Sequence, residues 1–141
     1  MLKTSYSTRK AVTDLSYKIT GCAITVHKEL GPGLLESVYE KCLLLELEHQ
    51  GYQVKRQQVV PIIYRGEELA AELRFDLLVE DTVIVEVKAV ENLHPIYEAQ
   101  LLSYMKLMEK PQGLLINFHS VNIVKGMRPM VNEYFEALLP E

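Results

Sequence analysis

Residues 83–88 read VIVEVK, an apolar stretch that carries two charged residues. Successive side chains of a strand point to opposite faces of a sheet, so Glu86 and Lys88 share one face and the three valines share the other. The valines predict a strand that packs on a core. A carboxylate and an amine on so apolar a strand require a separate explanation.

The stretch before it, ELRFDLLV at 72–79, has the composition of a second strand. A short loop around Glu80-Asp81 separates it from 82–90, which predicts a β-hairpin. If the loop consists of the three residues 80–82, Val79 lies opposite Val83. A two-residue loop shifts the pairing by one position, and the pattern leaves both registers open.

In the first register Asp76 faces Glu86, and Arg74 faces Lys88. Two carboxylates in contact destabilise a sheet unless a proton or a cation lies between them. One divalent cation is the economical solution, because Mg²⁺ binds through one or two carboxylates and often contacts substrate phosphate as well. In the second register the two carboxylates lie on opposite faces.

Lys88 beside such a cation could take part in a hydrolysis reaction. It could hold the water that attacks the substrate, help to deprotonate that water, or neutralise charge on a phosphate. Glu86 and Lys88 share a face in either register. The competing interpretation is a solvated strand face on which the two residues form surface ion pairs.

Helical and strand periodicity extends this hairpin into a mixed α/β sheet with helices packed against it. We expect one domain over residues 1–141. The expected elements are helices at 8–30, 34–50 and 95–109, an extended segment at 52–64 that Pro61 demotes to an edge or bulge, a strand at 113–118, and over 121–139 a short strand or loop followed by a terminal helix.

Two of the helices carry further candidates. Glu36 lies near the start of helix 34–50 and Tyr39 follows one turn later, while Gln100 and Tyr104 share a face of helix 95–109. Complementing the helix dipole would by itself explain Glu36. A half-buried surface stripe would explain the other pair.

Composition limits the function classes. The formal net charge is −4, which argues against a strongly basic coat for non-specific nucleic-acid binding. The N-terminal stretch MLKTSYSTRKAV lacks the apolar region of a signal peptide, and no apolar run approaches the ~20 residues that span a membrane. We therefore expect a cytoplasmic protein without a membrane partner, with Cys22 and Cys42 in the core.

The motifs together resemble a known family. GLLESVY at 33–39 matches the G-x-x-E-x-x-Y signature of the GxxExxY proteins. FD at 75–76, EVK at 86–88 and AQLLSYMKL at 99–107 are similar to the PD-(D/E)XK nuclease superfamily, particularly its RecB-like and exonuclease-like branches. The resemblance covers about residues 20–118. It implies a restriction-endonuclease-like core of order α-β-β-β-α-β, here with an extra N-terminal helix.

The resemblance also implies roles for individual residues. The proline that often precedes the strand aspartate in the superfamily is absent, since Arg74 and Phe75 stand there. Four residues would be catalytic, namely Asp76, Glu86, Lys88 and Glu36. The metal ligands would be Asp76, Glu86, Glu36 and the main-chain carbonyl of Val87. The residues in contact with substrate would be Gln100, Tyr104 and Tyr39.

The resulting hypothesis is a nuclease that uses Mg²⁺ or Mn²⁺ to hydrolyse phosphodiester bonds of nucleic acid, with DNA favoured over RNA. Lys55, Arg56, Arg65 and Arg74 are candidates for phosphate contacts or for a merely solvated face. A domain this small could need a dimer to hold its substrate. The alternatives are a non-catalytic nucleic-acid- or protein-binding module that keeps the fold, and a structural protein whose strand charges only form ion pairs.

Overall fold

The computed structural model describes residues 5–141, apart from the side chains of residues 70–72. Residues 1–4 of the domain expected over 1–141 lie outside this described part. The elements in chain order are α1 (Arg9–Leu30), α2 (Glu36–His49), β1 (Val54–Arg56), β2 (Val59–Tyr64), β3 (Glu67–Arg74), β4 (Leu77–Val79), β5 (Val83–Lys88), α3 (Pro95–Leu107), β6 (Gln112–Asn117), a 3₁₀ turn (Ile123–Gly126), β7 (Met127–Val131) and α4 (Glu133–Glu136).

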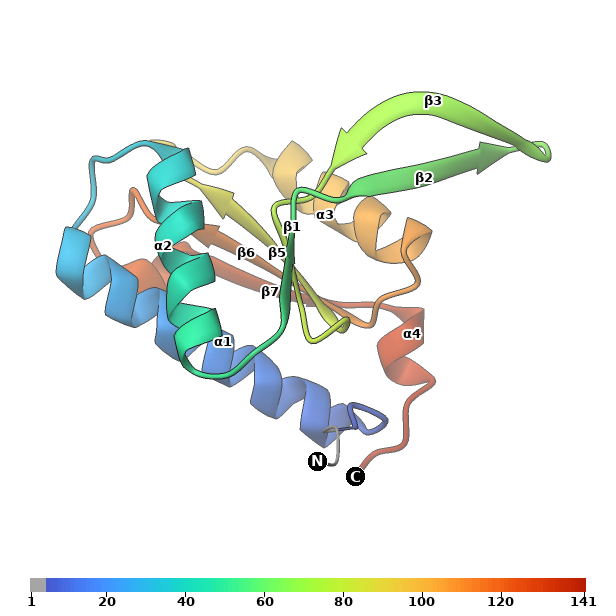
Figure 1. Cartoon of the computed structure of the whole chain (residues 1–141), viewed down its shortest axis with the longest axis horizontal. Coiled ribbons are helices and arrows are strands. Elements are labelled where there is room, and N and C mark those ends of the chain that lie inside the picture. The colour runs from blue at the N-terminus through green and yellow to red at the C-terminus, as the bar shows by residue number, and fades with distance from the viewer. Residues whose placement is uncertain (1–4) are drawn as a thin grey trace.

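Five of the strands form a mixed sheet in the order β1-β4-β5-β6-β7, in which only β5 and β6 run parallel (Figure 1). The valines of β5 pack with buried side chains of α1 and α2. Ile84, on the other face of β5, packs with buried side chains of α3. The predicted mixed α/β fold, with helices against the sheet, is confirmed.

The hairpin between β4 and β5 has the three-residue loop, because Val79 pairs with Val83 and Leu77 with Val85. This register brings Asp76, just before β4, next to Glu86. The expectation that Arg74 faces Lys88 is wrong. Arg74 pairs with Val59 of β2 instead, because the predicted strand 72–79 is divided at Phe75 and Asp76 between two sheets.

Strands β2 and β3 form a separate two-stranded ribbon that projects from the body of the molecule (Figure 1). Its register shifts between Val60 and Ile62, which confirms the irregularity predicted at Pro61. Arg65 and Gly66 form the turn with φ of 52° and 80°. Positive φ at both central residues is the requirement of the tight hairpin turn that matches strand twist.

Helix α3 packs against β6 at Gly113. A Cβ atom added to Gly113 would be 2.6 Å from the sulfur of Met105 and 2.9 Å from Cγ of Leu101. A larger residue at position 113 would therefore require these two side chains to move. Gly113 pairs with Ile84, which lies on the same face of β5 as Glu86 and Lys88.

The two ends of the described chain lie side by side (Figure 1). Thr8 and Leu139 form an isolated parallel bridge, and the Arg9 amide donates to the Leu139 carbonyl at 2.7 Å. The Arg9 guanidinium also donates to the Glu136 carbonyl at 2.7 Å. Between residues 5 and 141, no helix combines the length and the apolar character needed to cross a membrane.

Candidate active site

The side chains of Asp76 and Glu86 each accept a hydrogen bond from the main chain of the neighbouring segment. The Asp76 amide donates to Oε1 of Glu86 at 2.9 Å, and the Val87 amide donates to Oδ2 of Asp76 at 2.7 Å. The β4–β5 register produces this exchange, since it places the residue before β4 beside the end of β5. The two carboxylates are therefore neighbours, as the first of the two registers left open by the sequence predicted.

Both carboxyl groups hold their protons more tightly than usual. Burial raises the pKa of Asp76 to about 7; the Val87 hydrogen bond opposes this, while Glu40 and Glu36 add to it. Burial likewise raises the pKa of Glu86 to about 8, with the Asp76 charge as the next cause and Lys88 opposing. Only 7% of Glu86 is exposed. The pair is thus a buried acidic centre that a cation would stabilise.

Helix α2 contributes two acidic residues on one face, Glu36 and Glu40. Glu36 is exposed, and its charge contributes to the raised pKa of both Asp76 and Glu86. Glu40 is buried, and it accepts hydrogen bonds from Arg56 Nε at 2.6 Å and Gln57 Nε2 at 2.8 Å. Sequence reasoning missed Glu40, although its position four residues after Glu36 could have indicated it.

Lys88 points towards α3, where its ammonium nitrogen lies 4.5 Å from the centre of the Tyr97 ring. A cation over an aromatic face is attracted by the ring's quadrupole, which restricts the lysine without neutralising it. Tyr97 was not among the predicted residues. The proline-initiated start of α3 places it there, two positions after Pro95.

The two predicted residues of α3 differ in their surroundings. Tyr104 is 9% exposed, and burial raises the pKa of its phenol, with further contributions from Glu86 and then Asp76. The charges of the acidic pair therefore act on the Tyr104 phenol. Gln100 is exposed on the same helix and makes no hydrogen bond to the side chains that the structure describes.

Tyr39 does not suit the predicted substrate contact. Its side chain is fully buried and its ring stacks on Phe118, with 4.6 Å between the ring centres. Its hydroxyl donates to the Gly31 carbonyl and accepts from the Leu34 amide. Tyr39 instead holds the turn before α2, which sets the position of Glu36. Its spacing from Glu36 could not distinguish the two roles.

The residue types suit a divalent cation. Carboxylate oxygens are the donors that Mg²⁺ and Mn²⁺ prefer. Burial is the largest cause of the raised pKa values of Asp76 and Glu86, and the charges of neighbouring carboxylates, which a cation would offset, also contribute. The Val87 side chain is in the core, so only its main chain is available to the site. Among the described side chains, no three acidic, histidine or cysteine residues lie close enough to form a complete cation site.

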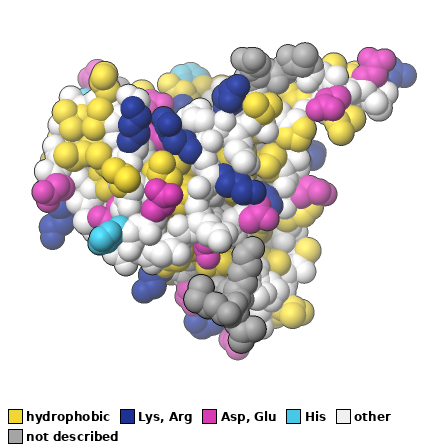
Figure 2. Space-filling model, in the orientation of Figure 1, with side chains coloured by type: hydrophobic (Ala, Val, Ile, Leu, Met, Phe, Trp, Pro, Cys, Tyr) yellow, Lys and Arg dark blue, Asp and Glu magenta, His cyan; other side chains and the backbone are white. Residues whose placement is uncertain are grey.

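Figure 2 shows basic and acidic side chains interspersed over the viewed face of the molecule. Of the four predicted phosphate contacts, Arg56 pairs with Glu40 and Arg74 donates to the Gln57 carbonyl at 3.2 Å. Lys55 and Arg65 are exposed.

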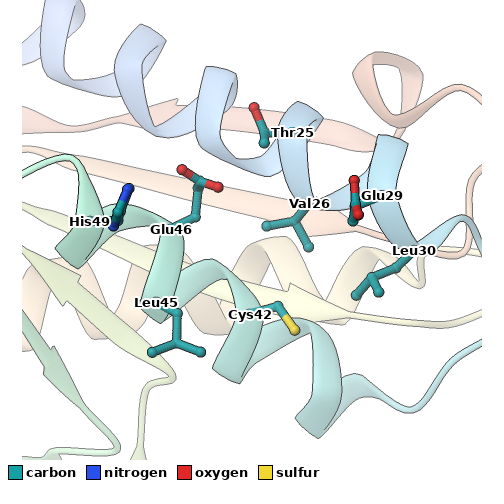
Figure 3. Close-up of a pocket in the computed structure, with 8 residues that line it drawn as sticks. All are labelled: Thr25, Val26, Glu29, Leu30, Cys42, Leu45, Glu46 and His49. Atoms are coloured by element: carbon teal, nitrogen blue, oxygen red, sulfur yellow. The ribbon is translucent and has the colours of Figure 1, made fainter.

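A separate pocket of about 500 Å³ lies between α1 and α2 (Figure 3). Its lining includes Glu29, Cys42 and His49, and none of the predicted site residues. The candidate site is therefore an arrangement of side chains at the ends of β3 and β5 and not this pocket.

Comparison with known families identifies the superfamily of this chain. A family model described as the PD-(D/E)XK nuclease superfamily matches residues 13–130. No curated protein and no solved structure matched the chain. The matched region contains the five-stranded sheet from β1 to most of β7, the α2 and α3 helices, and the Asp76, Glu86 and Lys88 constellation. The mixed sheet and flanking helices are consistent with the restriction-endonuclease-like fold of that superfamily, and the chain belongs to the PD-(D/E)XK nuclease superfamily.

Proposed function

We propose that this protein is a divalent-cation-dependent nuclease of the GxxExxY type, within the RecB-like and exonuclease-like branch of the superfamily. The observation that carries the proposal is the contact between Asp76 and Glu86, with Lys88 on the same face of β5. The substrate is nucleic acid, with DNA favoured over RNA.

Asp76 and Glu86 would hold the cation, Mg²⁺ or Mn²⁺, assisted by Glu36 and the main-chain carbonyl of Val87. When bound, such a cation lowers the pKa of a coordinated water and stabilises charge on a phosphate. Glu36 is exposed at the start of α2, so its side chain is free to turn towards the acidic pair. Oε1 of Glu86 accepts the Asp76 amide, whereas Oε2 has no hydrogen-bond partner among the described residues.

Lys88 supplies positive charge beside the acidic pair. Its ammonium group can donate to a phosphate oxygen or to the attacking water, and the Tyr97 ring restricts where that group lies. Tyr104, buried on the α3 side of the sheet, would contact substrate or orient Lys88. Gln100 is exposed one turn earlier on the same helix and would also contact substrate.

The test is cleavage of plasmid, single-stranded DNA and RNA with Mg²⁺ or Mn²⁺ and with EDTA. Asp76→Ala and Lys88→Ala should each lose activity by roughly 10²-fold or more, since each removes a group that acts in the transition state. Glu48→Ala, an exposed carboxylate of α2, is the matched control. Cleavage that persists unchanged in both site variants would show that this site is not responsible.

One observation favours a second candidate, a non-catalytic nucleic-acid- or protein-binding module. In the described structure the carboxylates of Asp76 and Glu86 bind main-chain amides, as purely structural carboxyl groups would. Calorimetry with Mn²⁺ separates the two functions. Binding that Asp76→Ala abolishes supports the nuclease, and no binding to the unmodified protein supports the module.

A further inference from the structure

Gln57 occupies an unusual backbone position between β1 and β2. Its φ is 51°, in the left-handed region, which is a strained conformation for a residue other than glycine. Its amide donates to the Asp76 carbonyl at 2.9 Å, and its carbonyl accepts from Arg74. The surrounding main chain therefore holds Gln57 in this conformation directly beside Asp76.

The side-chain amide of Gln57 joins two acidic residues. Its nitrogen donates to Oε1 of Glu40 at 2.8 Å and to Oδ1 of Asp76 at 3.2 Å. A primary amide nitrogen has two protons, and both are used here. The reversed orientation would place the amide oxygen against two carboxylates, so the chemistry of the neighbours determines which way the amide points.

The other end of this arrangement is anchored by an ion pair. Oε2 of Glu40 accepts from Arg56 at 2.6 Å, while Glu40 itself is only 4% exposed. The remaining oxygen of Asp76 accepts the Val87 amide. A continuous series of hydrogen bonds thus runs from Arg56 through Glu40 and Gln57 to Asp76 and into β5.

We infer that Gln57 is a positioning residue, which orients the Asp76 carboxylate through its two donated hydrogen bonds, with Glu40 and Arg56 fixing its far end. The inference rests on the proposed function for its role in cation binding, because Asp76 is a proposed ligand there. Residues that hydrogen-bond a metal ligand typically contribute about 10–100-fold to metal affinity or activity.

The test compares Gln57→Met, which keeps the chain length and removes the donors, with Gln58→Met as a matched control. Gln58 is the adjacent half-buried glutamine, and its side chain makes no hydrogen bond to the described residues. Amide NMR spectra in EDTA report the Val87 hydrogen bond without any metal. Calorimetry with Mn²⁺ and steady-state cleavage kinetics report affinity and kcat.

Gln57→Met should shift the Val87 amide proton upfield and weaken Mn²⁺ binding about 10-fold or more, with a fall in kcat. Gln58→Met should change neither. Should Gln57→Met not fold, Gln57→Asn tolerates positive φ and is too short to reach both acidic residues, so it serves as the second variant.

An unchanged Val87 resonance in folded Gln57→Met overturns the inference, as does a loss of thermal stability with unaltered Mn²⁺ affinity and kcat. Failure of the unmodified protein to bind Mn²⁺ would instead refute the proposed metal-dependent function. The Val87 resonance would then still decide whether Gln57 orients Asp76.

Discussion

Replacing Asp76 by asparagine should stabilise the metal-free protein at about pH 8 and change it little at about pH 4. The pKa of Asp76 is raised from 3.8 to about 7, so the folded state binds more protons than the unfolded state between these values. Stability of the unmodified protein therefore falls as pH rises through this window. Asparagine does not ionise in this pH range, so the stability of the variant does not decrease through this cause as the pH rises.

The magnitude follows from the shift. One pKa unit corresponds to about 1.4 kcal/mol, so about three units give an upper limit of about 4 kcal/mol. The neighbouring Glu86 shares part of this, because each carboxyl group raises the cost of ionising the other. Loss of the hydrogen bond from Gln57 to the carboxylate offsets about 1 kcal/mol. We expect a net stabilisation of about 1–3 kcal/mol above the folded-state pKa.

The assay is urea unfolding followed by circular dichroism in EDTA, at several values from about pH 4 to about pH 8. Glu48→Gln is the control for removing an exposed carboxylate of α2. Added Mn²⁺ should reverse the order, since only the unmodified protein gains stability from the bound ion. A difference between Asp76→Asn and the unmodified protein that does not grow with pH would refute the account of a buried, proton-holding pair.

Three further predictions test separate parts of the structure. Tyr97→Leu should lower kcat about 3–10-fold, because the Lys88 ammonium group loses the aromatic ring that restricts its position. Tyr97→Phe keeps the ring and should retain activity. An equal loss of activity in both variants would contradict the cation–aromatic contact. Gly113→Val should cost about 1–3 kcal/mol in urea unfolding because it forces α3 away from β6, while Gly21→Ala in an open part of α1 should be neutral or stabilising. Tyr39→Phe should lower the free energy of unfolding by about 1 kcal/mol, because the two hydrogen bonds of the hydroxyl are lost. The catalytic rate at saturating substrate should be retained. A rise in KM alone would instead support a contact between Tyr39 and substrate.

The elements with strong local patterns could be predicted from the sequence. Period-three and period-four apolar spacing located α1, α2 and α3 to within two residues of their observed ends, and alternation located β5. The β4–β5 register was one of two open possibilities, because loop length is not visible in alternation. The neighbouring Asp76 and Glu86 depended on that choice.

What could not be predicted depends on contacts between distant residues. The stretch 72–79 reads as one strand, and nothing local shows that its halves pair with β2 and β5 in separate sheets. The left-handed conformation of Gln57 has no signature in its side chain. In the sequence, Glu40 cannot be distinguished from any other charged residue of a helix, because its partner Arg56 lies sixteen residues away. The site's supporting hydrogen bonds are therefore tertiary information.

The bridge between Thr8 and Leu139 holds the two ends of the described chain next to each other. A short Gly/Ser linker could join its ends with little loop-closure entropy, and new termini could open at Arg65-Gly66, the exposed tip of the ribbon. Such a circular permutant would keep every strand of the five-stranded sheet intact. The order in which strands leave the ribosome could thereby be changed while the acidic pair keeps its surroundings.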